Sequence, residues 1–109
     1  MNTTETAAET LKTCDLATIT QPELAKLIGL SRHNFKYFLE YEDTNYTRLL
    51  QAERKRRCDL LIEQNPHFDV HGLMRKTGYT VNTSALRAFK RWYGVGMSQW
   101  KRQVLEATK

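Results

Sequence analysis

Hydrophobic positions recur at helical spacing along most of the chain and predict helices separated by short turns. The clearest case is residues 78–94 (GYTVNTSALRAFKRWYG). One face of this stretch is apolar and consists of Val81, Ala85, Ala88, Phe89 and Trp92. The other face carries an amide, a hydroxyl, an apolar tip and two positive charges: Asn82, Thr83, Leu86, Arg87 and Lys90. These groups suit base edges and phosphates, and no acid accompanies them.

An earlier stretch, residues 20–40, predicts two short helices around a tight turn. Thr20, Pro22 and Glu23 form a capping box with proline in the first helical turn. Gly29 then supplies the left-handed conformation in which a helix commonly ends. Ser31 caps the second helix. The residues expected to face inward are Leu24, Ala25, Ile28, Phe35, Phe38 and Leu39.

Weaker patterns predict the remaining helices. Within residues 1–16 a short helix is expected to bury Ala7, Ala8, Leu11 and Cys14. A long helix follows over residues 46–63, with Leu49, Leu50, Cys58, Leu61 and Ile62 as its buried candidates. Asp69 is expected to cap a helix to Lys76, with Val70, Leu73 and Met74 inward, before the turn at Gly78. Ser98 is expected to cap the last helix, with Trp100, Val104 and Leu105 inward.

Helix, glycine turn and helix therefore occur twice, around Gly29 and Gly78. A small residue four positions before the glycine, with apolar residues at fixed offsets after it, is typical of the helix-turn-helix motif. An αα-corner without a ligand is the alternative. We predict an all-α fold of about seven helices. It comprises a tail and short helix (1–19), a first helix-turn-helix unit (20–45), a linking helix (46–64) and a second unit with the C-terminal helix (65–109).

The linking helix sets the scale of this arrangement. About 17 residues at 1.5 Å each span roughly 26 Å. Two recognition helices so joined would lie about one duplex turn apart, roughly 34 Å. One monomer would then read two successive major-groove segments, without a palindromic site.

Composition narrows the class of protein. The chain has 109 residues and two cysteines, Cys14 and Cys58, too few for a disulfide framework or a metal cluster. It has no run resembling a membrane span, and its start is polar and acidic, unlike a signal peptide. No nucleophile–base pair, carboxylate dyad or phosphate-binding glycine loop indicates an enzyme. We expect a cytoplasmic protein without a cofactor.

The charge of +5 is unevenly distributed. No acid lies between Asp69 and Glu106, whereas seven bases do: Arg75, Lys76, Arg87, Lys90, Arg91, Lys101 and Arg102. This excess favours a polyanionic partner, against the alternative of a solvated basic surface. Residues 54–57 (RKRR) fit phosphate contact and a solvated face around one buried arginine equally well.

Several motifs resemble the DNA-binding domain of the AraC/XylS family. In the first half they are Leu24-Ala25, Gly29-Leu30-Ser31 and Phe35, followed by Arg54 and Cys58 on the linking helix. In the second half they are Gly78-Tyr79, the run FKRWYG at residues 89–94, and Ser98, Trp100 and Lys101 near the end. The resemblance covers about residues 20–102.

The resemblance implies a sequence-specific, double-stranded-DNA-binding transcriptional regulator with an asymmetric site of about 20 bp. It resembles the short MarA/SoxS/Rob-like type, whose members act as monomers, and we expect no effector domain here. The base-facing residues it implies are Arg32, His33, Lys36 and Tyr37 in the first unit, and Asn82, Thr83, Leu86 and Arg87 in the second. Lys90 and Arg91 complete the candidate DNA-binding set. The implied setting is the bacterial cytoplasm, at the nucleoid, with RNA polymerase as a further partner and no membrane contact.

Departures from the family pattern mark a divergent member. Tyr37 stands where the family commonly has arginine, and Leu39 where it has phenylalanine. Met74 replaces a close-packing alanine and Ala85 a larger core residue, a volume exchange that would compensate within one core. Met97 replaces the helix-starting proline. The first-unit departures favour an alternative function, an interaction module that modulates another regulator or RNA polymerase and binds DNA weakly. A domain cut from a longer regulator is a third hypothesis.

Several candidate residues have a second interpretation beside base contact. Arg87 suits bidentate contact with guanine, or a phosphate; Asn82 suits adenine, or caps its helix. Leu86 suits a thymine methyl group, or the edge of the core. His33 fits a base contact or simple exposure. His67 and His71 lie one helical turn apart, but no third ligand accompanies them to hold zinc.

Overall fold

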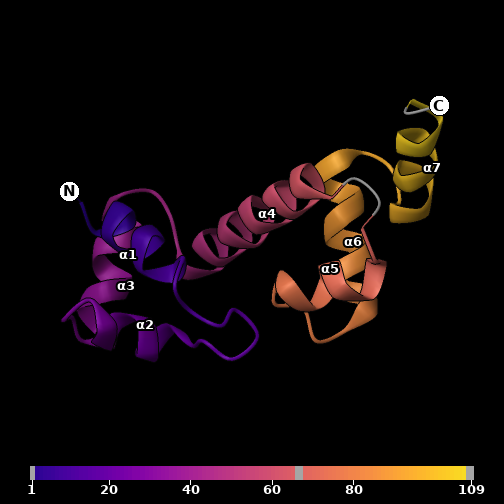
Figure 1. Cartoon of the computed structure of the whole chain (residues 1–109). Helices are drawn as coiled ribbons and strands as arrows, with labels where there is room; N and C mark the ends of the chain where they lie inside the picture. Colours follow the sequence, from indigo (N-terminus) through magenta and orange to yellow (C-terminus); the bar gives the residue numbers. More distant parts are fainter. Residues whose placement is uncertain (1, 66–67, 108–109) are drawn as a thin grey trace. The chain divides into compact units, whose positions relative to one another are not determined.

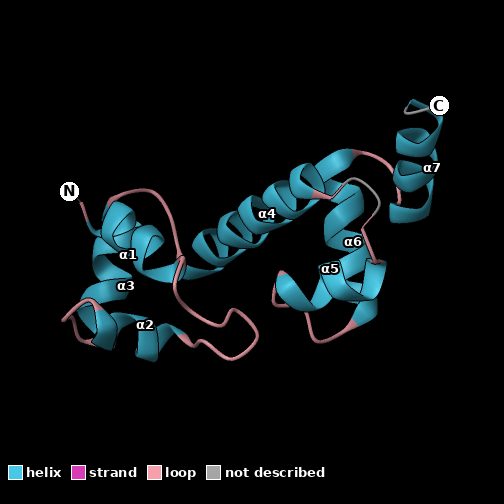
Figure 2. Ribbon diagram, viewed as in Figure 1, coloured by secondary structure: helices cyan, strands magenta, loops and turns pink. Residues whose placement is uncertain are grey.

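A computed structural model of the chain describes residues 2–65 and 68–107, without the side chains of Val70, His71, Asn82, Val104 and Leu105. Across these residues every regular element is an α-helix and there is no strand (Figures 1 and 2). The helices are α1 (Thr3–Leu11), α2 (Gln21–Leu27), α3 (Arg32–Tyr41), α4 (Tyr46–Gln64), α5 (Val70–Lys76), α6 (Asn82–Tyr93) and α7 (Met97–Ala107). The all-α, seven-helix prediction is confirmed. Within the described residues, no helix is long and apolar enough to cross a membrane.

The chain divides into two compact units, residues 1–54 (unit 1) and residues 55–109 (unit 2). The division falls inside α4, so its first half belongs to unit 1 and its second half to unit 2. Each unit contains one glycine-turn helix pair, α2–α3 or α5–α6, and a hydrophobic cluster of its own.

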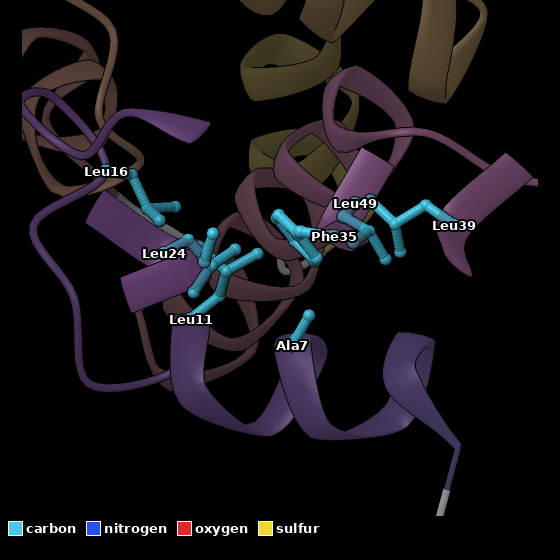
Figure 3. Packing of buried hydrophobic residues seen from close by; sticks show 8 residues of the cluster. Ala7, Leu11, Leu16, Leu24, Phe35, Leu39 and Leu49 are labelled. Carbon is cyan, nitrogen blue, oxygen red and sulfur yellow. The ribbon is translucent and has the colours of Figure 1, made fainter. Parts of the chain in front are cut away.

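The core of unit 1 forms where α1, α2, α3 and the start of α4 meet (Figure 3). Its buried members are Ala7, Leu11, Leu16, Leu24, Ala25, Phe35, Leu39 and Leu49. Figure 3 shows the side chains of Leu11, Leu24 and Phe35 converging from three different segments. Two side chains of α4 also reach loop carbonyls: the Tyr46 hydroxyl donates to Ile19 at 3.1 Å, and Arg54 Nη2 donates to Leu16 at 3.4 Å.

The core of unit 2 is richer in aromatic residues. Its buried members are Cys58, Phe68, Leu73, Met74, Ala85, Phe89 and Met97. Around them the rings of Tyr93 and Trp100 pack on Phe89, with centroid separations of 4.5 and 6.2 Å. This aromatic packing joins α6 to α7.

Unit 1 begins and ends its short helix as the sequence predicts. The Thr20 hydroxyl accepts a hydrogen bond from the Glu23 amide at 3.3 Å, and Gly29 adopts a φ of 79°. After the glycine, the Leu30 amide donates to the Ala25 carbonyl at 2.9 Å. This 6→1 bond is the mark of a Schellman turn, which pairs carbonyls that the helix end would leave unbonded.

Unit 2 repeats these features at positions 49 residues later. Asp69 stands in the place of Thr20 and accepts from the Gly72 amide at 3.0 Å. Gly78 stands in the place of Gly29, with a φ of 88°, and Tyr79 donates to Met74 at 3.1 Å. The second helices start at Arg32 and Asn82, so unit 2 has one more residue in its turn and the offset becomes 50 in α3 and α6.

The two cores exchange volume between equivalent positions. Unit 1 buries Ala25 and Phe35, small then large, whereas unit 2 buries Met74 and Ala85, large then small. Met74 and Ala85 lie in the same cluster and are almost wholly buried, as the compensating-volume expectation requires.

Three expectations differ from the structure. Phe38 was expected inward but is 37% exposed, because Phe35 and Leu39 occupy the centre of the buried face of α3. Val81 is 56% exposed because it is the N-cap of α6 and precedes the helical register. Helix α7 starts at Met97, so Ser98 lies inside its first turn and is not its cap. Met97 is buried in the core of unit 2, and this burial anchors the helix start.

Candidate nucleic-acid interface

Helix α6 presents a row of exposed, acid-free side chains. Thr83, Leu86, Arg87, Lys90 and Arg91 are all exposed. Helical spacing places residues 83, 86, 87 and 90 on one face, opposite the buried core residues. Asn82 starts the helix, but its side chain is outside the described part. Of the predicted second-unit set, every described side chain is therefore exposed.

The inner face of α6 holds this row in position. Ala85, Ala88 and Phe89 are buried against the rest of unit 2. The helix ends at Gly94, whose φ of 80° is left-handed and whose amide donates to the Lys90 carbonyl at 2.8 Å. Nothing lies within 4 Å of the place a Cβ would occupy on Gly94, so backbone conformation alone selects glycine here.

A polar contact fastens the end of α6 to the second half of α4. The Tyr93 hydroxyl donates a short hydrogen bond to Asp59, and the Lys55 ammonium bonds the other carboxylate oxygen at 3.0 Å. The same ammonium lies 5.5 Å from the centre of the Tyr93 ring. Burial, reinforced by the bond to Asp59, raises the pKa of Tyr93 far above its ordinary value, so its hydroxyl remains a donor. Burial also raises the pKa of the neighbouring Cys58, which therefore stays a thiol.

Helix α3 carries the first-unit candidates at the same spacing. Arg32, His33, Lys36 and Tyr37 are all exposed, with Phe35 and Leu39 buried behind them. The ring of Tyr37 packs edge-on against Phe38, with centroids 5.7 Å apart. The structure thus gathers the four predicted residues on the outside of one helix.

The charges of α3 run against its helix dipole. Arg32 and Lys36 lie in the first half of the helix, at its positive end, and Glu40 lies in the last turn, at its negative end. The dipole acts mainly in the terminal turns, so the placements of Arg32 and Glu40 each cost a few tenths of a kcal/mol rather than stabilising the helix. In α6 the bases of the last turn, Lys90 and Arg91, agree with the dipole. The position of Arg32 is thus not explained by helix stability, and a bound anion would offset its cost.

The two units differ in overall charge. Unit 1 holds eight acidic and six basic side chains, a net charge of −2. Unit 2 holds four acidic and eleven basic side chains, a net charge of +7. The positive field that attracts a polyanion therefore belongs to unit 2.

The basic run at residues 54–57 has structural partners. Arg54 donates a hydrogen bond to the Leu16 carbonyl, and Lys55 pairs with Asp59. Arg56 and Arg57 are half-buried and also interact with other residues. Of the two interpretations of this run, the structural one is favoured over phosphate contact. Lys101 likewise lies 5.7 Å from the centre of the Phe68 ring.

Sequence reasoning missed the exposed aromatic residues of unit 1. Tyr41 is 78% exposed and Phe38 is partly exposed, next to Tyr37 on α3. Tyr41 follows Tyr37 by four residues, and this spacing on one helix side was the available signal. Within the described residues no three potential metal-ligating side chains come together; His67 and the His71 side chain lie outside that part.

No known family model matches the chain, and no curated protein matches its sequence. Solved structures, in contrast, match its fold. A DNA-binding transcriptional dual regulator from Escherichia coli K-12 superimposes with a TM-score of 0.85 at 20% identity, over 97% of this chain and 95% of that one. The transcriptional regulator CdpR from Pseudomonas aeruginosa gives 0.78 at 19%, over 92% of this chain and 31% of that one. The C-terminal domain of AraT, a response regulator from Geobacillus stearothermophilus, gives 0.74 at 18%, over 94% and 86%.

These likenesses establish the fold, which the chain shares with transcription regulators. All three neighbours are described as regulators and none as an enzyme. At 18–20% identity, membership of the AraC/XylS family stays an expectation from the sequence motifs.

Proposed function

We propose that this protein is a sequence-specific, double-stranded-DNA-binding transcription regulator of the short AraC/XylS type, acting as a monomer. The observation that carries the proposal is the exposed, acid-free face of α6, held on a glycine-turn helix pair in a unit of net charge +7. The shared fold with a DNA-binding regulator supports it.

In this proposal α6 lies in a major groove and its residues divide by role. Arg87 is near the middle of the exposed row, where a guanidinium can bond O6 and N7 of one guanine. Thr83 and Leu86 flank it, with a hydroxyl for a base edge and a methyl-bearing tip for thymine. Lys90 and Arg91, at the negative end of the helix, serve phosphates. Asn82 is assigned to adenine.

Helix α3 enters a neighbouring groove segment in the same proposal. Arg32, His33 and Lys36 provide polar contacts, and the phosphates near its N-terminus offset the unfavourable position of Arg32. Tyr37 contributes a ring and a hydroxyl where the family pattern has arginine. The expected setting is the bacterial cytoplasm, at the nucleoid, with RNA polymerase as a second partner.

Binding-site selection followed by footprinting tests the proposal first. Engagement of both units predicts an asymmetric site of about 20 bp with two protected major-groove segments about 10 bp apart. The affinity for the selected site should fall steeply with salt, by a slope of about 0.9 per phosphate contacted.

Two substitutions then separate base contact from phosphate contact. Arg87→Ala should weaken the selected site about tenfold or more and relax its preference at one position. Lys90→Ala should weaken all sequences alike and reduce the salt slope by about one. Lys12→Ala is the matched control, because Lys12 is exposed in unit 1 and pairs with Glu9 at 2.7 Å. Salt-insensitive or undetectable binding to every selected sequence would refute the proposal.

A second candidate function rests on a different observation. The exposed aromatic residues of α3 favour the interaction-module alternative for unit 1. Undetectable DNA binding by a folded protein would favour it for the whole chain.

A further inference from the structure

A groove of about 310 Å³ lies in unit 2, along α5 and the end of α4. This volume is at the lower end of the range in which proteins bind small molecules. The residues that line it are Leu61, Asn65, Phe68, Asp69, Gly72, Leu73, Arg75 and Lys76. None of them belongs to the candidate DNA-binding set, so the proposed function leaves the groove unexplained.

The apolar part of the lining is held in place by the core of unit 2. Phe68 and Leu73 are each 4% exposed, and Leu61 packs against the same cluster. Gly72 lies beside them and adds no side chain to the groove. A ring and two leucines fixed in this way offer a preformed surface to the apolar body of a ligand.

The charged part of the lining favours an anion. Arg75 and Lys76 are exposed in the last turn of α5, where the helix dipole favours bases, yet neither charged group forms a hydrogen bond or ion pair among the described residues. Asp69, the acid of the lining, already accepts the helix-capping hydrogen bond at 3.0 Å, and Glu63 of α4 does not line the groove. Lys101 of α7 adds a positive charge 5.7 Å from the ring centre of the lining phenylalanine. Positive charge therefore exceeds negative charge around the groove.

The repeat shows how unit 1 treats the same position. At the 49-residue offset, Leu24 is the equivalent of Leu73, and its side chain meets Leu11 of α1 in the core (Figure 3). Helix α1 packs directly on α2. The same position of the glycine-turn pair is thus packed by a preceding helix in unit 1 and borders a groove in unit 2.

We propose that this groove binds a small apolar carboxylate. The apolar body of the ligand packs on Leu61, Phe68 and Leu73, while its carboxylate pairs with Arg75 and Lys76. The apolar lining favours such a molecule over inorganic phosphate. Binding itself does not depend on DNA. Its regulatory consequence, a lower DNA affinity because two bases of unit 2 are neutralised, rests on the proposed function.

The experiment titrates the full chain, labelled with ¹⁵N, with cinnamate as the probe. The expected result is shift changes at the amides of Leu61, Gly72 and Lys76. A dissociation constant in the low millimolar range or tighter is expected for a ligand of about 11 non-hydrogen atoms. Cinnamamide keeps the shape without the charge and should bind about fivefold more weakly, because neutral hydrogen bonds are weaker than charge-assisted ones. Inorganic phosphate at the same concentration should cause none of these shifts.

Substitutions test the two bases. Arg75→Gln and Lys76→Gln change exposed side chains, so both variants should fold, and each should weaken cinnamate binding about fivefold. Arg102→Gln is the matched control, because Arg102 is an exposed base of α7 that does not line the groove. It should leave cinnamate binding unchanged, which separates the groove from the general attraction of an anion to a unit of net charge +7.

Several outcomes would overturn the groove as a carboxylate site. They are shifts confined to α6 or α7, equal binding of cinnamamide, the same shifts with inorganic phosphate, equal weakening by Arg102→Gln, and no shift at about ten times the expected dissociation constant. Cinnamate binding in the groove without any DNA binding would support the ligand site and refute the regulator function alone. DNA binding without cinnamate binding would do the reverse. Both kinds of binding, with DNA affinity unchanged by cinnamate, would support the site and refute its regulatory consequence.

Discussion

Units 1 and 2 build the same turn from different residues. Both begin the first helix of the pair with a side-chain oxygen on an amide three residues on, and both end it with a left-handed glycine and a 6→1 hydrogen bond. The cap itself changes from a threonine hydroxyl to an aspartate carboxylate. What recurs is the hydrogen bond and the backbone conformation, because buried or terminal amides must be paired whatever side chain supplies the acceptor.

The cores and the exposed surfaces of the two units differ more than their turns do. Large and small residues trade places between Ala25/Phe35 and Met74/Ala85, so each core keeps one large and one small residue but in the opposite order. The outer faces of α3 and α6 share only their spacing, and Glu40 stands where unit 2 has Lys90. Between the two units, the choice of residue is therefore constrained most by backbone geometry, less by core volume and least by the chemistry of the exposed surface.

The largest expected effect tests whether the units are stable separately. Phe35→Ala removes a fully buried ring from unit 1 and should cost about 3–5 kcal/mol of its stability. Both tryptophans, Trp92 and Trp100, belong to unit 2 and report on it selectively. We expect amide-exchange protection to be lost in α1–α3 while the tryptophan fluorescence transition in urea keeps its midpoint. An equal shift of that midpoint would show one cooperative unit instead.

A second prediction tests the exchanged volumes. Met74→Ala should destabilise unit 2 by about 2–5 kcal/mol, since it leaves a cavity beside Ala85. Adding Ala85→Phe recreates the small–large order of unit 1 and should recover about 1 kcal/mol or more. Urea unfolding followed by tryptophan fluorescence measures both. A double variant less stable than Met74→Ala would contradict the compensation.

A third prediction makes the first recognition helix resemble the second. Tyr37→Arg places a guanidinium at the position equivalent to Arg87. We expect DNA affinity to rise about tenfold at low salt and the salt slope to steepen by about 0.9 for the added phosphate contact. Tyr37→Phe keeps the ring without the charge and is the matched control. An unchanged slope would place α3 outside the DNA interface.

The smallest expected effect concerns acid sensitivity. The Thr4 amide donates to the Glu42 carboxylate at 2.9 Å, and this bond holds the pKa of Glu42 below its ordinary value of 4.5. A carboxyl whose pKa is lower in the folded state contributes stability above the unfolded-state pKa, and loses it as the pH falls through the folded-state value. Glu42→Gln should therefore weaken unit 1 at neutral pH but make little difference in acid below that range. Amide exchange at α1, measured at both pH values, checks this; a pH-independent difference would contradict it.

The sequence was sufficient for the turns because their requirements are local. Thr20, Gly29, Asp69 and Gly78 each act within five residues of chain, and the structure confirms all four. Helical spacing also identified the centre of each buried face, Phe35 and Leu39 in α3 and Ala85 and Phe89 in α6, although Phe38 at the edge of the α3 face is exposed. The 49-residue offset between Gly29 and Gly78 also identified the repeat.

The sequence could not predict which positions would be covered by distant segments of the chain. Phe38 and Ala88 occupy equivalent positions, yet only the second is covered, and helical spacing cannot say which neighbour will pack there. The start of α7 was misplaced for a similar reason, since the burial of Met97 depends on residues far along the chain. The candidate DNA-binding side chains that the structure describes lie exposed on α3 and α6, but exposure does not identify a ligand.

The two hydrophobic clusters have no residue in common. For an evolving lineage we expect this to separate the effects of mutations, so that a change that loosens one cluster leaves the packing of the other intact. The surface of unit 1 can then drift or acquire a new partner while unit 2 retains its own selected role. Such a chain can gain regulatory connections one half at a time.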